Sequence, residues 1–326
     1  MSTQDLIDLP LNEKIVEHFQ NPRNIGEIEN PDGFAVIGDP RCGDYIKVWL
    51  KINNEKITDF KFKVFGCWGA ISTTSVVSEL AIGKSLKEAS VLTDDDVVRE
   101  LGGIPQNKQH CSLLGVQGLR TAIADYLIKD NHKKYMQRVE QYRELGYDFP
   151  LARDFMVQMI RDVPETALVL DVGTGKGHLA LAIARSGRKC ISVDISDEEI
   201  HYAQLNAIYY RLDHLIQFKN QNAQNLNFDN NHFDVVMTAA FIHHLSDPEP
   251  VLNEFIRVCK PGGKIVISDF NENGLKMVDK RHREEGGVHH VYGWRMEKVQ
   301  KWFEDRQYKT KLVNEEFETI VTVTLR

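Results

Sequence analysis

The sequence of 326 residues lacks several features that would set it apart from ordinary globular proteins. No apolar run approaches the ~20 residues of a membrane-spanning helix, so no membrane association is expected. Basic residues are not in excess: 40 Lys and Arg stand against 47 Asp and Glu, a net charge of −7. Nucleic acid is therefore not an expected partner. The first residues, MSTQDLIDLPLNEK, carry acids where a signal peptide would be basic and then apolar, which predicts a cytoplasmic location.

Cysteine is scarce, with five residues and no Cys-x-x-Cys pair. An odd number of widely spread cysteines argues against a disulfide framework, and cytosolic thiols stay reduced. Cys190 and Cys259 lie in or beside apolar segments and are expected to be small core residues. The other three, Cys42, Cys67 and Cys111, fall within the first 111 residues and require another explanation.

The length favours two domains. Residues 1–130 are predicted to form an α+β unit. Its expected elements are helices at 13–19, from 71 onward, at 92–101 and at 112–128, with a hairpin of strands at 44–52 and 57–64. Residues 131–150 are highly charged and are read as a largely helical connector. From 151 to 326 strand and helix patterns alternate, which predicts a doubly wound parallel sheet.

A glycine-rich stretch, VLDVGTGKGHLALAIA, joins a buried strand to an amphipathic helix in the second domain. Glycines at 173, 175 and 177 allow a tight turn and close approach of a ligand to the backbone. The dinucleotide fingerprint would require glycine at 178, where this chain has His178. The pattern therefore argues against NAD.

Counted from Asp171, the pattern Asp-x-Gly-x-Gly-x-Gly resembles motif I of the class I S-adenosylmethionine-dependent methyltransferases. Asp194 and the segments QNAQNLNF, FDVVMTAAFIHHLSDP and VCKPGGKIVISD follow in the order of that family. The resemblance implies a Rossmann-like fold over 151–326 and the cofactor S-adenosyl-L-methionine. It implies that Asp194 accepts from the ribose hydroxyls and that Asn222 and Ala223 meet the adenine. The implied cofactor-binding residues are Asp171, Gly173, Thr174, Gly175, Gly177, Asp194, Ile195, Asn222, Ala223 and Thr238.

His243 and His244 are the candidate catalytic residues, because this family often contacts cofactor or substrate at their position. Methyl transfer depends mainly on proximity and desolvation, so a general base is optional. The segment VHHVYGW holds His289, His290, Tyr292 and Trp294, which could line a substrate pocket or serve as surface or core residues.

The three early cysteines stand near other metal-binding side chains. Cys67 and Cys111 are placed at predicted helix N-termini, where the helix dipole favours thiolate. Asp44 and His110 each lie within two residues of a cysteine. Together these five residues exceed the four ligands that zinc or an iron–sulfur cluster requires. A Cys–His hydrolase pair would need an orienting residue and an oxyanion site, which nothing in the sequence marks.

The segments HFQNPRNIG, CGD, FGCWGAISTTS and KQHCSLLG, with a following AIADY, resemble the IscU/NifU-type iron–sulfur cluster assembly scaffolds over residues 13–128. The resemblance implies that Cys42, Asp44, Cys67, His110 and Cys111 hold an iron–sulfur cluster, of the 2Fe–2S type, or zinc, with Lys108 as a modulator. It also implies partners: a cysteine desulfurase, cluster acceptor proteins and a second copy of the chain as a homodimer. The segment from Ile104 to Lys108 departs from the chaperone-recognition motif of the family, so release by that chaperone is not expected.

The sequence thus predicts a methyltransferase fused to an iron–sulfur or metal-binding scaffold domain, acting on a small-molecule, thiol or metal-linked acceptor. The alternative is a carrier scaffold for clusters or sulfur whose S-adenosylmethionine-binding domain is regulatory. The intact glycine loop and Asp194 favour the enzyme.

Overall fold

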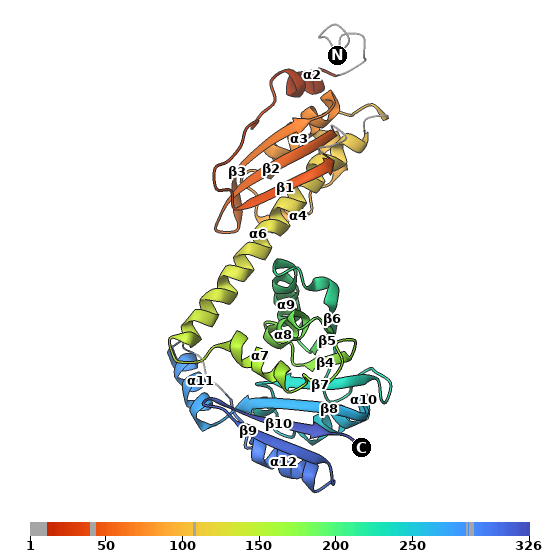
Figure 1. Cartoon of the computed structure of the whole chain (residues 1–326). Coiled ribbons are helices and arrows are strands. Elements are labelled where there is room, and N and C mark those ends of the chain that lie inside the picture. The colour runs from red at the N-terminus through yellow and green to blue at the C-terminus, as the bar shows by residue number, and fades with distance from the viewer. Residues whose placement is uncertain (1–11, 40–43, 107–108, 285, 287–289) are drawn as a thin grey trace. The chain divides into compact units, whose positions relative to one another are not determined.

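The computed structural model describes residues 12–39, 44–106, 109–284, 286 and 290–326 (Figure 1). Of these, the side chains at 39, 44, 109, 110 and 112 are not described. The chain divides into two compact units, Met1–Asp130 and Asn131–Arg326. Helix α6 (Gln109–Arg143) continues through the division, and residues 131–150, expected as a connector, belong to the second unit. No helix in the described ranges is long and apolar enough to cross a membrane.

The first unit is built on an antiparallel sheet in the order β1–β2–β3, comprising β1 (Gly33–Asp39), β2 (Asp44–Asn53) and β3 (Lys56–Phe65). Strands β2 and β3 confirm the predicted hairpin. Asn54 and Glu55 form its turn with φ of 48° and 58°, the backbone twist that tight hairpins favour. Strand β1 was not predicted; its residues GFAVIGD carry glycine at positions where strand propensity is low.

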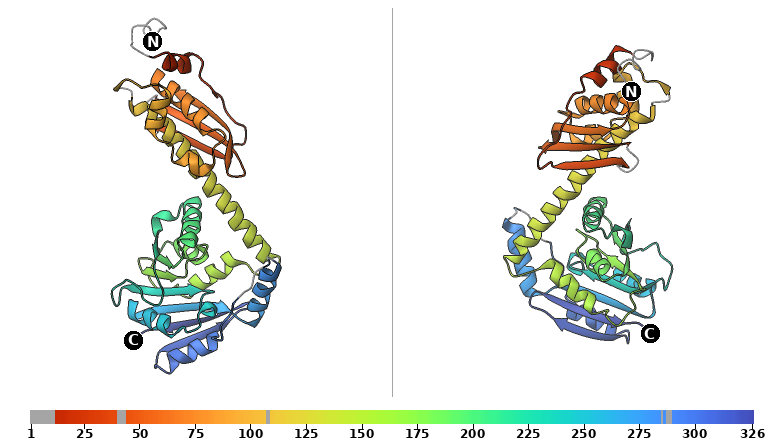
Figure 2. Two further views of the ribbon diagram at one scale, coloured as in Figure 1. Left: turned by 180° about the vertical axis from the view of Figure 1, so that it is seen from behind. Right: turned by 45° about the horizontal axis from the view of Figure 1, so that its top comes forward.

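Helices cover one face of this sheet, as the opposite views in Figures 1 and 2 show. They are α2 (Glu13–Gln20), α3 (Trp68–Ala81), α4 (Leu86–Ser90), α5 (Asp94–Glu100) and the first part of α6. The helix expected at 92–101 is α5, and α4, which precedes it, was not predicted; each of the two begins with a capping box. Helix α6 lies so close to the sheet that a Cβ on Gly118 would be 2.9 Å from Ile46 and Val48 side-chain atoms.

The described residues of the second unit form a seven-stranded sheet in the order β6–β5–β4–β7–β8–β10–β9. Its strands are β4 (Leu168–Val172), β5 (Lys189–Asp194), β6 (Ile216–Asn220), β7 (Phe233–Ala239), β8 (Cys259–Phe270), β9 (Lys309–Asn314) and β10 (Glu318–Thr324). Strands β4 to β8 are parallel, as predicted. Strand β10 is antiparallel to both neighbours, because a tight turn closed by the Glu315 N–H and the Glu318 carbonyl reverses the chain after β9.

Both faces of this sheet are covered. The end of α6 packs on one face with α7 (Phe149–Gln158), α8 (His178–Arg185) and α9 (Asp197–Tyr209), and α10 (Glu249–Val258) and α12 (Met296–Glu304) pack on the other. Helix α11 (Glu272–Glu284) follows β8. The strand order reverses at β4, which lies between β5 and β7. In such sheets ligands bind outside the carboxyl ends of the strands at the point of reversal.

Candidate functional sites

Three glycines turn the chain from β4 into α8. Gly173, Gly175 and Gly177 have φ of 83°, 49° and 84°, a region that glycine enters without steric cost. A Cβ on Gly173 would lie 2.9 Å from the Phe241 ring, and one on Gly177 would lie 3.0 Å from the Cβ of Ala203. A Cβ on Gly175 would meet no described atom within 4 Å. The first and third glycines therefore serve packing, and the second faces open space.

Asp194, at the end of β5, holds this turn with its carboxylate. Its Oδ2 accepts from the N–H of Gly175 at 3.0 Å, and its Oδ1 accepts from the N–H of Ser196 at 3.0 Å. Each carboxylate oxygen has two lone pairs, so each can accept one further hydrogen bond. Two such acceptors side by side suit a pair of neighbouring hydroxyl groups.

Asp171, in β4 beneath the glycine turn, is completely buried. Its Oδ2 accepts from the Ser192 hydroxyl at 2.7 Å, and that hydroxyl lies 2.6 Å from Oγ1 of Thr174. Its Oδ1 is buried without a hydrogen-bond partner among the described residues. Burial raises the pKa of the Asp171 carboxyl to about 7. Asp171 lines neither of the two cavities that border this turn, and it acts on the glycine turn through Ser192 and Thr174.

One cavity, of about 290 Å³, opens beyond the ends of β4 and β5. The predicted residues that line it are Gly173, Asp194, Ile195, Asn222 and Ala223. Ile195 is 71% exposed and supplies an apolar wall. The Asn222 side-chain oxygen accepts from the N–H of Gln224 at 2.9 Å and retains a second lone pair. The cavity thus combines an apolar surface, a carboxylate and an amide, which suits a nucleoside.

A second cavity, of about 450 Å³, shares Gly173 with the first. It is lined by Thr174, Gly175, His243 and His244, together with residues of α6, α7 and α11. His243 is buried, and its Nδ1 lies 2.5 Å from Oδ1 of Asp269. Asp269 Oδ2 also accepts from the backbone N–H of His243 at 2.7 Å. This carboxylate orients the imidazole and makes Nδ1 the protonated nitrogen, so Nε2 carries the lone pair.

His178, at the start of α8, lines the same cavity and is partly buried. Its ring stacks on Phe149 at 4.8 Å between centroids, and its Nδ1 has no hydrogen-bond partner in the described structure. Burial lowers the pKa of His178 to about 3. His178, which stands where the dinucleotide fingerprint would require glycine, therefore places a neutral imidazole at the edge of the candidate active site.

Arg153 lines this cavity and belongs to a buried ion pair. Arg153 Nη1 donates to both oxygens of Glu318, at 2.8 and 2.9 Å, and both side chains are less than 5% exposed. Glu318 also accepts from the hydroxyls of Ser268, at 2.8 Å, and Tyr147. Full hydrogen bonding of this kind offsets the cost of burying charge.

Other residues proposed from sequence lie elsewhere. Thr238 is buried inside the sheet, donating to the Val172 carbonyl at 2.6 Å, and neither it nor Gly177 is among the residues that line the two cavities. Tyr292 is half-exposed, and its N–H donates to the His243 carbonyl at 2.8 Å. The Trp294 ring packs against the core beneath the ammonium of Lys298.

His290 is exposed, whereas His289 lies outside the described residues. The sequence did not predict that Asp269, His178 and Arg153 would be part of the candidate site. Only Asp269 gave a recognisable signal, as a carboxylate near the end of an apolar strand, KIVISDF.

In the first unit the structure brings Cys67 and Cys111 together. Their sulfurs are 3.6 Å apart, well beyond the roughly 2.05 Å of a disulfide bond. Cys67 is the N-cap of α3, and Cys111 lies in the first turn of α6 with its carbonyl accepting from Thr73 at 3.1 Å. A Cβ on Gly69 would be 3.2 Å from the Cys111 sulfur and 3.6 Å from the Cys67 sulfur. Glycine there leaves room at the sulfur pair.

The other predicted ligands are only partly described. Cys42 and Lys108 lie outside the described residues, and Asp44 and His110 are described by their backbone alone. Tyr45 pairs with Phe65, so the start of β2 adjoins the end of β3, two residues before Cys67. No group of three or more candidate metal ligands occurs among the residues that the structure describes. Cys190 and Cys259 are buried core residues.

Comparisons with known proteins assign both units. The family model described as "NifU-like N terminal domain" matches residues 11–133, and the model described as "Methyltransferase domain" matches residues 170–267. The iron-sulfur cluster assembly scaffold protein IscU 1 of Archaeoglobus fulgidus is 42% identical over 141 residues, which are 43% of this chain and 88% of that protein. The Escherichia coli scaffold protein IscU is 42% identical over 125 residues, 37% of this chain and 97% of that protein.

Solved structures similar to this chain include a SAM-dependent methyltransferase from Methanosarcina mazei, with 22% identity and a TM-score of 0.41, covering 50% of this chain and 94% of that one. The chain belongs to the IscU-type iron–sulfur cluster assembly scaffold family through its first unit, and it carries a class I methyltransferase domain in its second. The predicted fusion of these two families and the predicted fold class are thereby confirmed.

Proposed function

We propose that the second unit transfers the methyl group of S-adenosyl-L-methionine to a small-molecule, thiol or metal-linked acceptor. In this proposal the first unit holds an iron–sulfur cluster or zinc that serves the reaction or senses redox state. The observation that supports the proposal most strongly is the meeting of two cavities at Gly173. One is lined by Asp194, and the other is lined by His243, whose imidazole is held by Asp269.

The residues present fit S-adenosyl-L-methionine. Asp194 has two acceptor positions for the ribose hydroxyls, and Ile195 and Asn222 offer an apolar wall and an amide for the adenine. The open space at Gly175 suits the amino-acid end, and the buried Asp171 supports the glycine turn through Ser192 and Thr174. When bound, the cofactor supplies a methyl group made electrophilic by its sulfonium.

His243 is the candidate general base. Asp269 holds the proton on Nδ1, so Nε2 is the nitrogen that can take a proton from a hydroxyl, thiol or amine. The residue is buried at the wall of the cavity, where desolvation strengthens a nucleophile. His244 adjoins it, with ring centroids 3.9 Å apart, and is the second candidate for contact with the acceptor.

For the first unit we propose the metal ligands Cys42, Asp44, Cys67, His110 and Cys111. Two cysteine sulfurs already lie side by side at the N-terminal ends of α3 and α6, an arrangement that suits zinc or a 2Fe–2S cluster. Membership of the scaffold family supports a role for a cysteine desulfurase as sulfur donor and for proteins that accept clusters.

The 42% identity of the first unit to scaffold proteins supports a second candidate function, in which the chain mainly carries clusters and its methyltransferase domain binds the cofactor as a regulator. The two candidates differ in turnover. A carrier would bind S-adenosyl-L-methionine without consuming it, whereas an enzyme would release S-adenosylhomocysteine.

The test is a screen of small-molecule, thiol and metal-linked acceptors for S-adenosylhomocysteine production, with cluster-loaded and metal-free protein side by side. We expect turnover that His243→Gln lowers and that the control His214→Gln, at an exposed position of the same unit, leaves unchanged. Binding of the cofactor without turnover over the whole screen would favour the carrier.

A further inference from the structure

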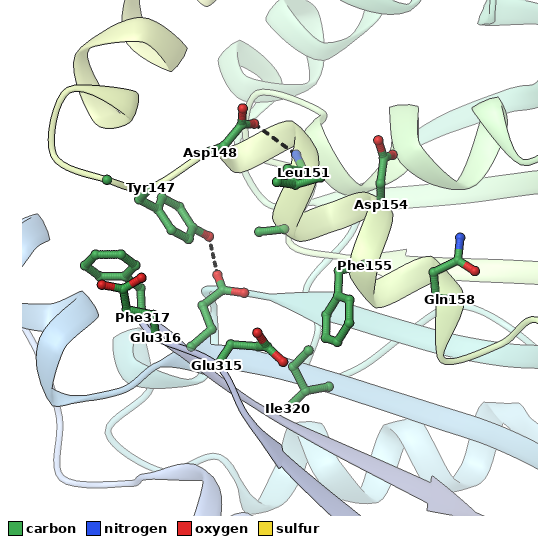
Figure 3. A pocket seen from close by; sticks show the side chains of 13 residues that line it. Tyr147, Asp148, Leu151, Asp154, Phe155, Gln158, Glu315, Glu316, Phe317 and Ile320 are labelled. Carbon is green, nitrogen blue, oxygen red and sulfur yellow. Dashed lines mark hydrogen bonds between the residues drawn. The ribbon is translucent and has the colours of Figure 1, made fainter.

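The second unit contains another cavity that the proposed methyl transfer does not use. It has a volume of about 540 Å³, which lies in the range of small-molecule sites. Its walls are α7, the loop Gly146–Asp148 before it, and the turn from β9 into β10 (Figure 3). None of its described lining residues is shared with the two cavities at the glycine turn.

Helix α7 separates this cavity from the candidate active site. Phe149 and Arg153 line the active-site cavity, whereas Leu151, Ala152 and Phe155 line the new one. Helix α7 buries Arg153 together with Met156 and Val157, whereas Leu151 is 68% and Phe155 37% exposed. Apolar side chains exposed inside a concave surface are typical of a ligand site.

The opposite wall is acidic. The carboxylates of Glu315 and Glu316 line the cavity, and no hydrogen bond or ion pair to either side chain occurs in the described structure. In Figure 3 the Glu315 side chain extends across the cavity toward Phe155 and Ile320. Both glutamates are exposed, and each brings a negative charge to this wall of the cavity.

No Lys, Arg or His is among the described lining residues of this cavity. Its three other acids already have basic partners outside the lining: Asp148 pairs with Arg143 and Asp154 with Arg185, each at 2.7 Å, and Glu318 pairs with Arg153 at 2.8 Å. The charge that remains uncompensated is therefore that of the two glutamates at the turn. The aromatic rings of Phe155 and Phe317 add surfaces on which a cation is favourable.

We propose that this cavity is a binding site for a small organic ammonium ion with an aromatic or branched aliphatic body. The apolar body packs against Leu151, Phe155 and Ile320, and the ammonium group lies beside Glu315 and Glu316. The site does not require the cofactor, because its lining is separate from the glycine turn.

The test uses the full chain and two probes of the same shape, 2-phenylethylamine, which is an ammonium ion at neutral pH, and the neutral 2-phenylethanol. We expect saturable calorimetric or NMR-detected binding of the amine at concentrations below roughly 10 mM, with the alcohol bound at least about fivefold more weakly. Saturating S-adenosylhomocysteine should leave amine binding unchanged.

Two sets of variants separate the charge from the apolar wall. Glu315→Gln combined with Glu316→Gln should weaken amine binding about tenfold and remove the preference over the alcohol. The matched control, Glu165→Gln with Glu297→Gln, removes two exposed carboxylates elsewhere in the same unit. It should leave the affinity for both probes unchanged. Leu151→Ala should weaken the binding of both probes.

The proposal is overturned by any of four outcomes: no saturable binding of the amine, equal binding of the two probes, an amine preference that survives loss of both glutamates, or displacement by S-adenosylhomocysteine. Displacement would place the amine in the cofactor cavity. None of these outcomes depends on whether methyl transfer is observed.

Discussion

Asp269 contacts His243 through two hydrogen bonds, one to Nδ1 of the imidazole at 2.5 Å and one from the backbone N–H at 2.7 Å. The same carboxylate accepts from the N–H of Phe270 at 2.8 Å. Both side chains are less than 5% exposed. A carboxylate fixed by two backbone groups cannot turn away from the imidazole, so the orientation of His243 is set before any acceptor binds.

This geometry predicts the effect of Asp269→Asn. The amide can no longer hold the proton on Nδ1 as the carboxylate does, and we expect methyl transfer to fall roughly 10² to 10⁴-fold, the range for loss of a general base. His243→Gln should lower the rate of methyl transfer by a similar factor. S-adenosyl-L-methionine affinity should be unchanged, because neither residue lines the cavity that contains Asp194.

The measurement is the rate of S-adenosylhomocysteine formation with the acceptor found by screening, for both variants and for the double variant. Residues that act as a unit give a double variant no slower than the slower single one. If the rate losses of the two single variants multiply in the double variant, Asp269 and His243 act independently. Unchanged rates would contradict the assignment of His243 as the general base.

Asp171 and His178 predict an unusual pH dependence of stability. The folded pKa of Asp171 is raised from 3.8 to about 7, so its contribution to stability is present below about 3.8 and is lost as the pH rises through about 7. The folded pKa of His178 is lowered from 6.5 to about 3, so its contribution is present above about 6.5 and is lost as the pH falls toward 3. Between about pH 4 and 6.5 the two effects cancel.

Single substitutions should uncover each effect. We expect the free energy of unfolding of Asp171→Asn to fall on acidification below pH 6.5, and that of His178→Phe to fall as the pH rises from 4 to 7. Each slope should approach about 1.4 kcal/mol per pH unit. Urea unfolding at a series of pH values measures both, and profiles parallel to that of the unsubstituted protein would contradict the assignment.

The sequence was informative where a site is built from neighbours along the chain. The glycine turn could be recognised because it lies in one strand and the loop that follows it. Asp194 could be recognised because it lies at the end of the next strand. The hairpin of β2 and β3 was visible for the same reason, since its alternation and its turn residues are contiguous.

Relationships that depend on strand order could not be seen. Asp269 meets His243 because β8 lies beside β7, and Arg153 meets Glu318 because β10 inserts antiparallel between β8 and β9. Neither pairing has a local pattern in the sequence. The length of α6 was underestimated because its second half is polar, and its buried face appears only when Tyr135 and Val139 pack on the second unit.

The sulfur pair in the first unit predicts the behaviour of a cluster. Anaerobic reconstitution with iron and sulfide should give an absorbing species that Cys67→Ala abolishes, because the substitution removes one of the two sulfurs that lie side by side. The control Cys190→Ala removes a buried core thiol of the second unit and should retain the absorbance. A cluster retained in Cys67→Ala would contradict the ligand assignment, and colourless protein with one bound zinc would identify zinc as the occupant.

The central claim is that the second unit binds S-adenosyl-L-methionine at the glycine turn. Calorimetric titration of the cofactor into the full chain, into Asp194→Ala and into the exposed control Asp213→Ala tests it most directly. We expect one saturable site in the unsubstituted protein and in the control, and a loss of at least about 100-fold in affinity, roughly 2.7 kcal/mol, in Asp194→Ala. Undiminished binding in Asp194→Ala would contradict the account.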